Sequence, residues 1–327
     1  MSTLLEPRYL PKRLIALEKH VVSPSLEAEV IAGGVVQRNL PGTLDKLKDV
    51  GAVRIAAMDA GYLSMHVLAQ QSALGLEDPE GCRGANDAVH SVIVSRPTRF
   101  AGFAVLPMSL PEEAEAELNR SVTTLGSTGA MVWNHLKDGM YYDAARFHPV
   151  FATTQELDVT LCVHPATPTA DIASKLFAGN FSAAVTGKLG ITSWGWHVDA
   201  DSFVLRLYSA GLFDRFAKLV LIIRHNGERL PMFIDRIDLT GLRTDATFDR
   251  VWKTNTWSTT SAFFTVRQFY QLRQVSPVER IMYSVDYPFG TNTDGWAFVE
   301  KLAEAQVPSD AEMDIVAWRN AEKLLGL

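Results

Sequence analysis

Short apolar runs rich in β-branched residues recur along the whole chain, separated by longer stretches in which polar residues are frequent. A run that is apolar on both of its faces is typical of a strand in a buried parallel sheet. The pattern predicts eight strands: Leu14–Leu17, Val53–Met58, Phe100–Leu106, Ala130–Trp133, Val159–Val163, Leu219–Ile223, Thr254–Ser258 and Ile281–Val285.

The stretches between these runs have helical composition. Residues Thr43–Asp49 predict one helix, and Pro111–Leu118 begins another with a proline and acidic residues, which the first turn of a helix favours. Residues Ala311–Leu327 predict a closing helix. Strands that alternate with helices in this way indicate an α/β fold, and eight repeats favour a closed (β/α)8 TIM barrel over an open sheet.

Two connections are longer than a loop and a helix require. They are residues 20–53, after the first strand, and residues 165–218, after the fifth, which include Trp194–His197 and the helical run Phe203–Phe216. Long insertions at this end of a barrel commonly form lids or subunit contacts. Because no linker, repeat or low-complexity segment interrupts the pattern, residues 1–327 are predicted to form a single domain with insertions after strands 1 and 5.

Composition excludes several classes of function. The formal net charge of −6 disfavours nucleic acid as a partner, because binding many phosphates needs a basic face. No apolar window is long enough for a membrane span, and residues 1–19 lack the pattern of a signal peptide. The two cysteines, Cys82 and Cys162, cannot staple a chain of 327 residues. A cytoplasmic protein with no membrane or nucleic-acid partner is therefore expected.

Ionisable residues stand where four of the predicted strands end. Glu18 and His20 close the first strand, and period-two alternation directs both side chains to one face. His164 closes the fifth strand, His225 the sixth and Asp286 the eighth. Because the carboxyl ends of barrel strands meet at one rim, these side chains are predicted to converge there.

Carboxylates and imidazoles at one rim are suited to a divalent cation with open coordination positions. Each residue alone has a structural alternative: Glu18 and His20 in a solvated loop, His164 as a hydrogen-bonded core histidine, Asp286 as a turn or helix cap, and His225 orienting its loop through Glu228. The combination, spread over four strand ends, favours the metal site.

The chain resembles the amidohydrolase superfamily, in the branch of aminocarboxymuconate-semialdehyde decarboxylase and the hydroxybenzoate decarboxylases. The segment from Trp194 to Asp238 resembles the dihydroxybenzoate and γ-resorcylate decarboxylases in particular. The resemblance covers nearly the whole chain, and five segments carry it: Ile15–His20, Val163–Pro165, His225–Pro231, Tyr283–Phe289 and Asn320–Leu327.

The resemblance implies one divalent ion, Zn²⁺ or Mn²⁺ with Mg²⁺ as a further candidate, bound by four residues: Glu18, His20, His164 and Asp286. Of these, His20 is the ligand that related sites can omit. The resemblance also implies that His225 either faces the substrate or supports the residues that contact the metal, with Glu228 bonded nearby. A second metal would need a bridging lysine, and the nearest, Lys137, is expected in a solvated loop.

Two residues depart from the family pattern. The family usually has glycine before the sixth-strand histidine and in its seventh-strand motif, where this chain has Arg224 and Ala262. Arg224 could bind a substrate carboxylate bidentately. Strand alternation slightly favours the alternative, in which Arg224 points outward into a salt bridge.

The activity implied by the resemblance is non-oxidative decarboxylation of a small hydroxylated aromatic carboxylic acid. Asp286 would protonate the ring carbon before CO₂ leaves, which requires an Asp286 that holds its proton near neutral pH; Glu18 and a dry pocket would favour this. His225 and Glu228 would assist. Arg229 or Arg224 would hold a second anionic group. Four aromatic residues either flank the ring or belong to the core: Trp194, Trp196, Tyr287 and Phe289.

Two other functions use the same residues. The first is hydrolysis of an ester, lactone, amide or activated C–C bond by a metal-bound water. The second is a degenerate barrel that binds a ligand without catalysis, which Arg224 and Ala262 motivate. The long insertions and the family both predict a homodimer or homotetramer.

Overall fold

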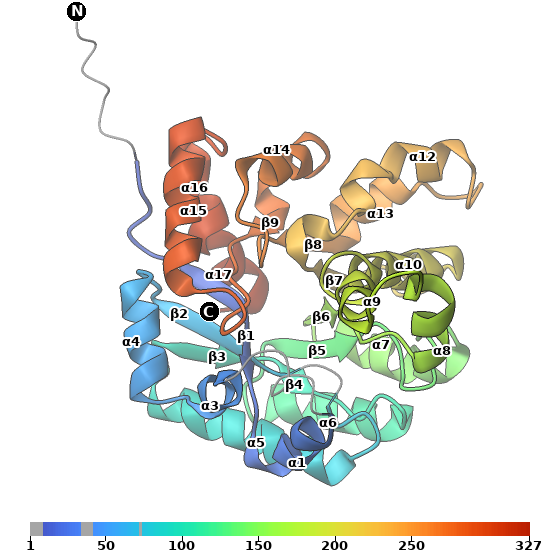
Figure 1. Ribbon diagram of the computed structural model, residues 1–327, viewed down its shortest axis with the longest axis horizontal. Coiled ribbons are helices and arrows are strands. Elements are labelled where there is room, and N and C mark those ends of the chain that lie inside the picture. Colours follow the sequence, from blue (N-terminus) through green and yellow to red (C-terminus); the bar gives the residue numbers. More distant parts are fainter. Residues whose placement is uncertain (1–8, 34–41, 72–73) are drawn as a thin grey trace, which may run out of the picture.

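Parallel strands surrounded by helices form the body of the protein (Figure 1). The structure is a computed structural model, and it describes residues 9–33, 42–71 and 74–327. The strands are β1 (Ile15–Val21), β2 (Met65–Gln70), β3 (Phe100–Gly102), β4 (Ala104–Val105), β5 (Gly129–Trp133), β6 (Thr160–His164), β7 (Val220–Ile223), β8 (Thr256–Thr259) and β9 (Ile281–Met282). The predicted absence of a signal peptide concerns residues 1–19, of which 1–8 lie outside the described residues, as do residues 34–41 of the first insertion.

Within each of two sheets, every strand pairs in parallel with the next along the chain. The order is β1-β2-β3 in one sheet and β4-β5-β6-β7-β8-β9 in the other. Only Phe103 separates β3 from β4, and its backbone N–H donates to Leu68 of β2 at 2.8 Å. Counted as one interrupted strand, β3 and β4 complete eight barrel strands.

The first strand, β1, meets the segment that follows the last strand, β9. A single parallel bridge joins Leu17 of β1 to Ser284, just after β9, and the Ser284 hydroxyl donates to the Leu17 carbonyl at 2.5 Å. The backbone N–H of His20 donates to Tyr287 at 2.9 Å. The expected α/β barrel fold is therefore confirmed, although its hydrogen-bond ladder is not continuous at this junction.

One predicted strand is wrong. Residues Val53–Met58 lie in the helix α4 (Ala52–Ala60), and the second strand is β2, which the pattern missed. Arg54 and Met58, four residues apart, are the buried positions of α4, which is helical spacing. In β2, the polar residues His66 and Gln70 are buried, and they interrupt the apolar pattern by which a buried strand is predicted.

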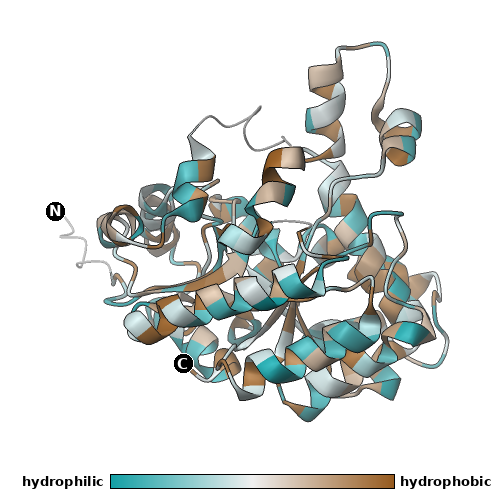
Figure 2. Cartoon of the chain, turned by 90° about the horizontal axis from the view of Figure 1, so that it is seen from below, coloured by the Kyte–Doolittle hydropathy of each residue, from teal (hydrophilic) through white to brown (hydrophobic). Residues whose placement is uncertain are grey.

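Helices cover the strands, and hydrophilic and hydrophobic residues alternate along these helices (Figure 2), as in amphipathic helices. Before the fifth barrel strand they are α1 (Glu27–Gly33), α3 (Thr43–Lys48), α4, α5 (Pro79–Ser95), α6 (Pro111–Thr123) and α7 (His148–Glu156). As predicted, α6 has Pro111 in its first turn, followed by Glu112 and Glu113. The side chain of Asp78 caps α5 by accepting from the Gly81 N–H at 2.9 Å.

The second insertion is helical. It contains α8 (Ala170–Ile172), α9 (Ala183–Gly190), α10 (Gly195–Ser209) and α11 (Leu212–Arg215), so the predicted run Phe203–Phe216 is two helices separated at Gly211, which has a φ of 72°. The remaining helices are α12 (Ile234–Leu239), α13 (Phe248–Asn255), α14 (Val266–Val275), α15 (Asn292–Ala305), α16 (Asp310–Asp314) and α17 (Asn320–Leu325). Among the described residues, no helix is both long and apolar enough to cross a membrane.

Candidate metal centre and active site

Strained backbone marks the carboxyl ends of the strands. Of the nine non-glycine residues that have positive φ within the described ranges, five follow the ends of strands: His225, Asn226, Glu228, Ala262 and Asp286. A sixth, Glu18, lies inside β1. Such conformations cost free energy and persist where packing enforces them, commonly at functional sites. At Glu18 the pairing between β1 and β2 also shifts register between Ala16 and Lys19, so simple alternation does not describe this strand.

Three of the predicted metal ligands come together. His20, His164 and Asp286 are buried and each offers a ligand atom, and these three atoms lie within 4.8 Å of one another. His20 Nε2 is 3.0 Å from Asp286 Oδ1. The two imidazole rings are 5.0 Å apart and nearly perpendicular.

The environment of both imidazoles suits metal binding. His164 Nδ1 faces the Pro165 carbonyl at 2.7 Å, and His20 Nδ1 faces the Gln70 carbonyl at 3.4 Å. A carbonyl at Nδ1 favours a proton there and leaves Nε2 as the ligand. Burial lowers the pKa of both histidines, which keeps them in the neutral form that a metal requires.

Glu18 lies beside this group but is not part of it. Its carboxylate is fully buried and accepts a hydrogen bond from Thr259 Oγ1 at 2.8 Å, and its Oε2 lies 3.3 Å from Ser284 Oγ. Its Oε2 is also 2.9 Å from Arg224 Nε. Glu18 is therefore engaged with protein groups on several sides.

The expectation that Arg224 points outward is wrong. Arg224 is 1% exposed, and its guanidinium pairs with both Glu18 and Asp286 inside the site. Arg224 follows the last residue of β7, Ile223, where regular strand alternation has ended. Two buried carboxylates attract the guanidinium into the barrel because an unpaired buried charge is costly.

The expectation of a protonated Asp286 is not supported by its surroundings. Burial raises the pKa of the Asp286 carboxyl, but Arg224 and His20 outweigh burial and hold it well below its ordinary value. Asp286 is therefore ionised at neutral pH in this state of the protein.

A second buried cluster contains His225 and Glu228 together with a histidine that the sequence analysis did not select, His197 of α10. His225 Nδ1 is 2.6 Å from Glu228 Oε1, and His197 Nδ1 makes a short contact to Glu228 Oε2. His197 Nε2 also faces the Thr192 carbonyl at 3.1 Å. The sequence predicts a long insertion over residues 165–218 that includes Trp194–His197, but nothing in the spacing of these residues indicates a partner for Glu228.

The charges of this cluster support one another. Burial raises the pKa of Glu228, but His225 and His197 outweigh burial and bring that pKa to about 2. Burial lowers the pKa of His197, whereas its bond to Glu228 raises it, and the net pKa is raised. Glu228 is therefore an anion that fixes two imidazoles.

The remaining predicted residues lie in different environments. Phe289 is partly exposed, and its ring is 5.6 Å from that of His20, so it borders the metal ligands. Tyr287 is buried, and its ring lies 4.9 Å from the Arg54 guanidinium. Lys137 is on the surface and pairs with Glu29 and Glu77, as a solvated residue would.

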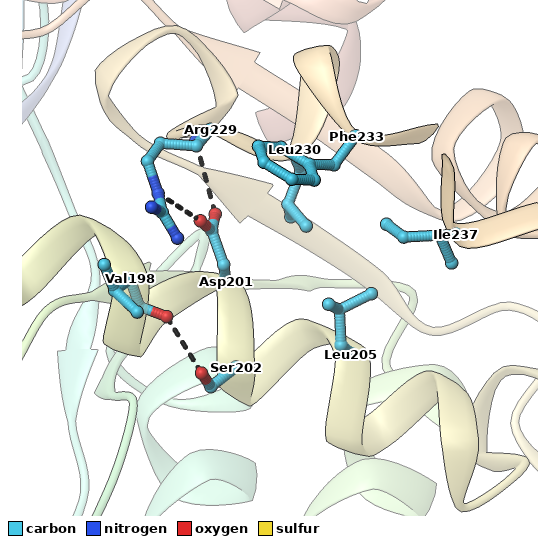
Figure 3. A pocket seen from close by; sticks show the side chains of 8 residues that line it. All are labelled: Val198, Asp201, Ser202, Leu205, Arg229, Leu230, Phe233 and Ile237. Carbon is cyan, nitrogen blue, oxygen red and sulfur yellow. Dashed lines mark hydrogen bonds and ion pairs between the residues drawn. The ribbon is translucent and has the colours of Figure 1, made fainter. Parts of the chain in front are cut away.

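Arg229 is held away from the metal ligands by its own partners. Its Nε is 2.9 Å from Asp201, and its guanidinium lies 4.3 Å from the Trp194 ring centre. Figure 3 shows both residues of this ion pair in a pocket that α10 forms with the segment Arg229–Ile237. Among the described residues, Arg229 has no ion pair with the metal-ligand group.

A family model described as amidohydrolase matches residues 44–327. The chain belongs to the amidohydrolase family. Among curated relatives, this amidohydrolase is 38% identical to the decarboxylase orsB of Emericella nidulans over 323 residues, which cover 95% of this chain and 96% of that protein. It is 31% identical to the γ-resorcylate decarboxylase of Polaromonas, with 96% and 98% of the two chains covered.

Solved structures agree with these relatives. The amidohydrolase matches a dihydroxybenzoic acid decarboxylase from Polaromonas, solved with manganese and 2-nitroresorcinol, with a TM-score of 0.86, 27% identity and 97% and 98% of the chains covered. It matches the 5-carboxyvanillate decarboxylase of Sphingomonas paucimobilis with a TM-score of 0.82, 26% identity and 97% and 100% coverage. The expected family and enzyme class, a carboxy-lyase of the amidohydrolase superfamily, are confirmed.

Ala262 provides a test of the backbone at the rim. Ala262 is exposed and has a φ of 59°, so this chain keeps the left-handed conformation that the family's usual glycine adopts easily. Replacing Ala262 by glycine is expected to raise the free energy of unfolding by about 1 kcal/mol, because a Cβ strains this conformation. Urea unfolding would measure the change, and a loss of stability would contradict the assignment of strain to Ala262.

Proposed function

We propose that this amidohydrolase is a metal-dependent, non-oxidative decarboxylase of a small hydroxylated aromatic carboxylic acid. The observation that carries the proposal is the convergence of His20, His164 and Asp286 at the carboxyl ends of three strands, beside the buried pair His225 and Glu228. The relatives named as decarboxylases support the choice of reaction.

One divalent ion would be held by His20, His164 and Asp286. Manganese is the first candidate, because the Polaromonas relative was solved with it, and Zn²⁺ and Mg²⁺ are the alternatives. When bound, the ion would supply Lewis acidity and a template for the carboxylate and an adjacent phenolic oxygen of the substrate.

Asp286 would move the proton. Because it is ionised at rest, Asp286 must first accept a proton, and the phenolic O–H of the substrate is the nearest source in a chelating pose. That proton then passes to the ring carbon bearing the carboxylate. The bond between this carbon and the carboxylate breaks, CO₂ leaves, and the product phenolate takes a proton from water.

Two other residues would orient the substrate. The Glu228 carboxylate accepts from His225 Nδ1–H, which leaves Nε2 of a neutral ring as the acceptor for a hydroxyl group of the substrate. Phe289, which borders His20, would pack against the aromatic ring. Arg229 would not contact the substrate; it would act through its ion pair with Asp201 on α10.

A substrate panel tests the reaction. The Mn²⁺-loaded protein is expected to release CO₂ from at least one of 2,6-dihydroxybenzoate, 2,3-dihydroxybenzoate and 5-carboxyvanillate, with the decarboxylated phenol formed in equal amount. Acid release from esters or lactones without CO₂ from any of the three would instead establish the hydrolase. Inactivity on every compound would favour a barrel that only binds ligands.

Removal of metal is expected to abolish the activity. Dialysis against a chelator should lower kcat by about 100-fold or more, because Lewis-acid stabilisation of this kind contributes several kcal/mol. Adding Mn²⁺ should restore the activity, and metal analysis should then find one ion per chain. Full activity in chelated protein with no detectable metal would refute the metal requirement.

A further inference from the structure

Arg224 places a permanent positive charge inside the predicted metal centre. Its guanidinium bridges Glu18 of β1 and Asp286, which follows β9, and it is 1% exposed. Both of its partners are carboxylates that the family resemblance implies as metal ligands. The guanidinium therefore competes with an ion for the same two negative charges.

The geometry separates these two carboxylates. An oxygen of Asp286 lies within 4.8 Å of ligand nitrogens of both His20 and His164, and Glu18 is not part of that group. Both Glu18 oxygens already have partners, since Oε1 accepts from Thr259 and Oε2 lies close to Arg224 and Ser284. Glu18 is therefore committed to the barrel wall and to Arg224.

The net charge of the site shows what Arg224 changes for the binding of an ion. Glu18 and Asp286 carry two negative charges, and Arg224 reduces the net charge of the three residues to minus one. A divalent ion would bring it to plus one, whereas without Arg224 it would be neutral. A centre with one net positive charge attracts a substrate that arrives as a carboxylate, but it holds its ion less tightly.

We propose that Arg224 is the residue that keeps Glu18 out of the metal's coordination shell, so that the ion is held by only three protein groups, His20, His164 and Asp286. The consequences are a lower ion affinity and an additional coordination position for the substrate. This inference rests on the metal site of the proposed function but not on the identity of the substrate.

The decisive experiment is a crystal structure of the Mn²⁺-loaded full chain, with the ion located by anomalous scattering. In the unmodified protein, the Glu18 oxygens should remain paired with Arg224 and clearly beyond bonding distance of the ion. In Arg224→Gly, which introduces the family's usual residue, a Glu18 oxygen should move to about 2.2 Å from the ion. A Glu18 oxygen bonded to manganese in the unmodified protein would overturn the proposal.

Ion affinity provides a second measurement, by competition of a fluorescent chelator for Mn²⁺ without substrate. Arg224→Gly and Arg224→Met should both bind Mn²⁺ at least about tenfold more tightly than the unmodified protein, because a nearby positive charge is removed and a ligand gained. Adding Glu18→Gln should then reduce affinity by a larger factor in the Arg224→Met background than in the unmodified protein. Equal factors in the two backgrounds, or no gain from either Arg224 variant, would overturn the proposal.

A control variant and thermal melting separate an effect on ion binding from an effect on folding. Arg280→Met removes a half-buried arginine that stacks on Trp257, just before β9 at the opposite end of the strand, and it should leave Mn²⁺ affinity unchanged. Melting of the Arg224 variants should depend strongly on added Mn²⁺, because the ion replaces the lost counter-charge of Glu18. If the unmodified protein binds Mn²⁺ through His20, His164 and Asp286 but decarboxylates nothing, the proposed function fails while this inference stands.

Discussion

Replacing Asp286 by asparagine is expected to lower kcat for decarboxylation by about 1000-fold. General acid–base groups contribute roughly 100- to 10,000-fold, and this residue is also a predicted metal ligand. Its carboxylate lies 3.0 Å from His20 Nε2 and pairs with Arg224. The amide in the variant has no negative charge for the ion or Arg224, and it cannot carry the proton to the ring.

The measurement is steady-state CO₂ release with Mn²⁺ at saturation, so that weaker metal binding alone does not explain a loss. Asp294→Asn is a matched control, because Asp294 is exposed in the first turn of α15 and only eight residues away. The control should retain the activity of the unmodified protein. A saturated Asp286→Asn enzyme with a tenth or more of that activity would remove Asp286 from the proton transfer.

Replacing Glu228 by glutamine is expected to destabilise the fold by about 3 kcal/mol at pH 5.5 and also to reduce activity. The Glu228 side chain is 1% exposed and lies between two histidines, so its loss leaves imidazolium charge buried without a partner. Glutamine has nearly the same shape, and the change therefore tests charge more than packing.

The pH dependence of this effect follows from the two pKa shifts. The pKa of Glu228 is depressed to about 2, so its contribution is present above its unfolded value of 4.5 and is lost as the pH falls towards 2. The pKa of His197 is raised, so its contribution is present below 6.5 and is lost as the pH rises through the folded value. Both contributions are therefore present between about 4.5 and 6.5.

Urea unfolding of the unmodified protein and Glu228→Gln across this range tests the argument. The difference in unfolding free energy should be greatest between pH 4.5 and 6.5 and should decrease on both sides. A difference that is constant with pH would show that packing, and not the Glu228 charge, accounts for the loss.

Secondary structure was predictable where local pattern and burial agree. The runs that became β5, β6 and β7 are almost entirely apolar, and the helix α6 begins with the proline and acidic residues expected of a first turn. The prediction failed where they disagree. Residues 53–58 are apolar but helical, and β2 contains His66 and Gln70, which are polar but buried.

Some residues of the site could be predicted from the sequence and others could not. His164, His225 and Asp286 could be selected because each stands where a strand ends, and parallel strands of a barrel bring those ends to one rim. His197 could not be selected, because α10 approaches Glu228 only through the folding of the long second insertion.

The sequence by itself determined the barrel fold, the family and the residue types available at the rim, because strand order and strand ends follow from local patterns. Only the tertiary structure decided the direction of Arg224, the separation of Glu18 from the other metal ligands, and the charge state of Asp286. Each of these depends on which charges meet in a buried space, and electrostatic attraction between residues as distant in the chain as Glu18, Arg224 and Asp286 leaves no trace in local periodicity.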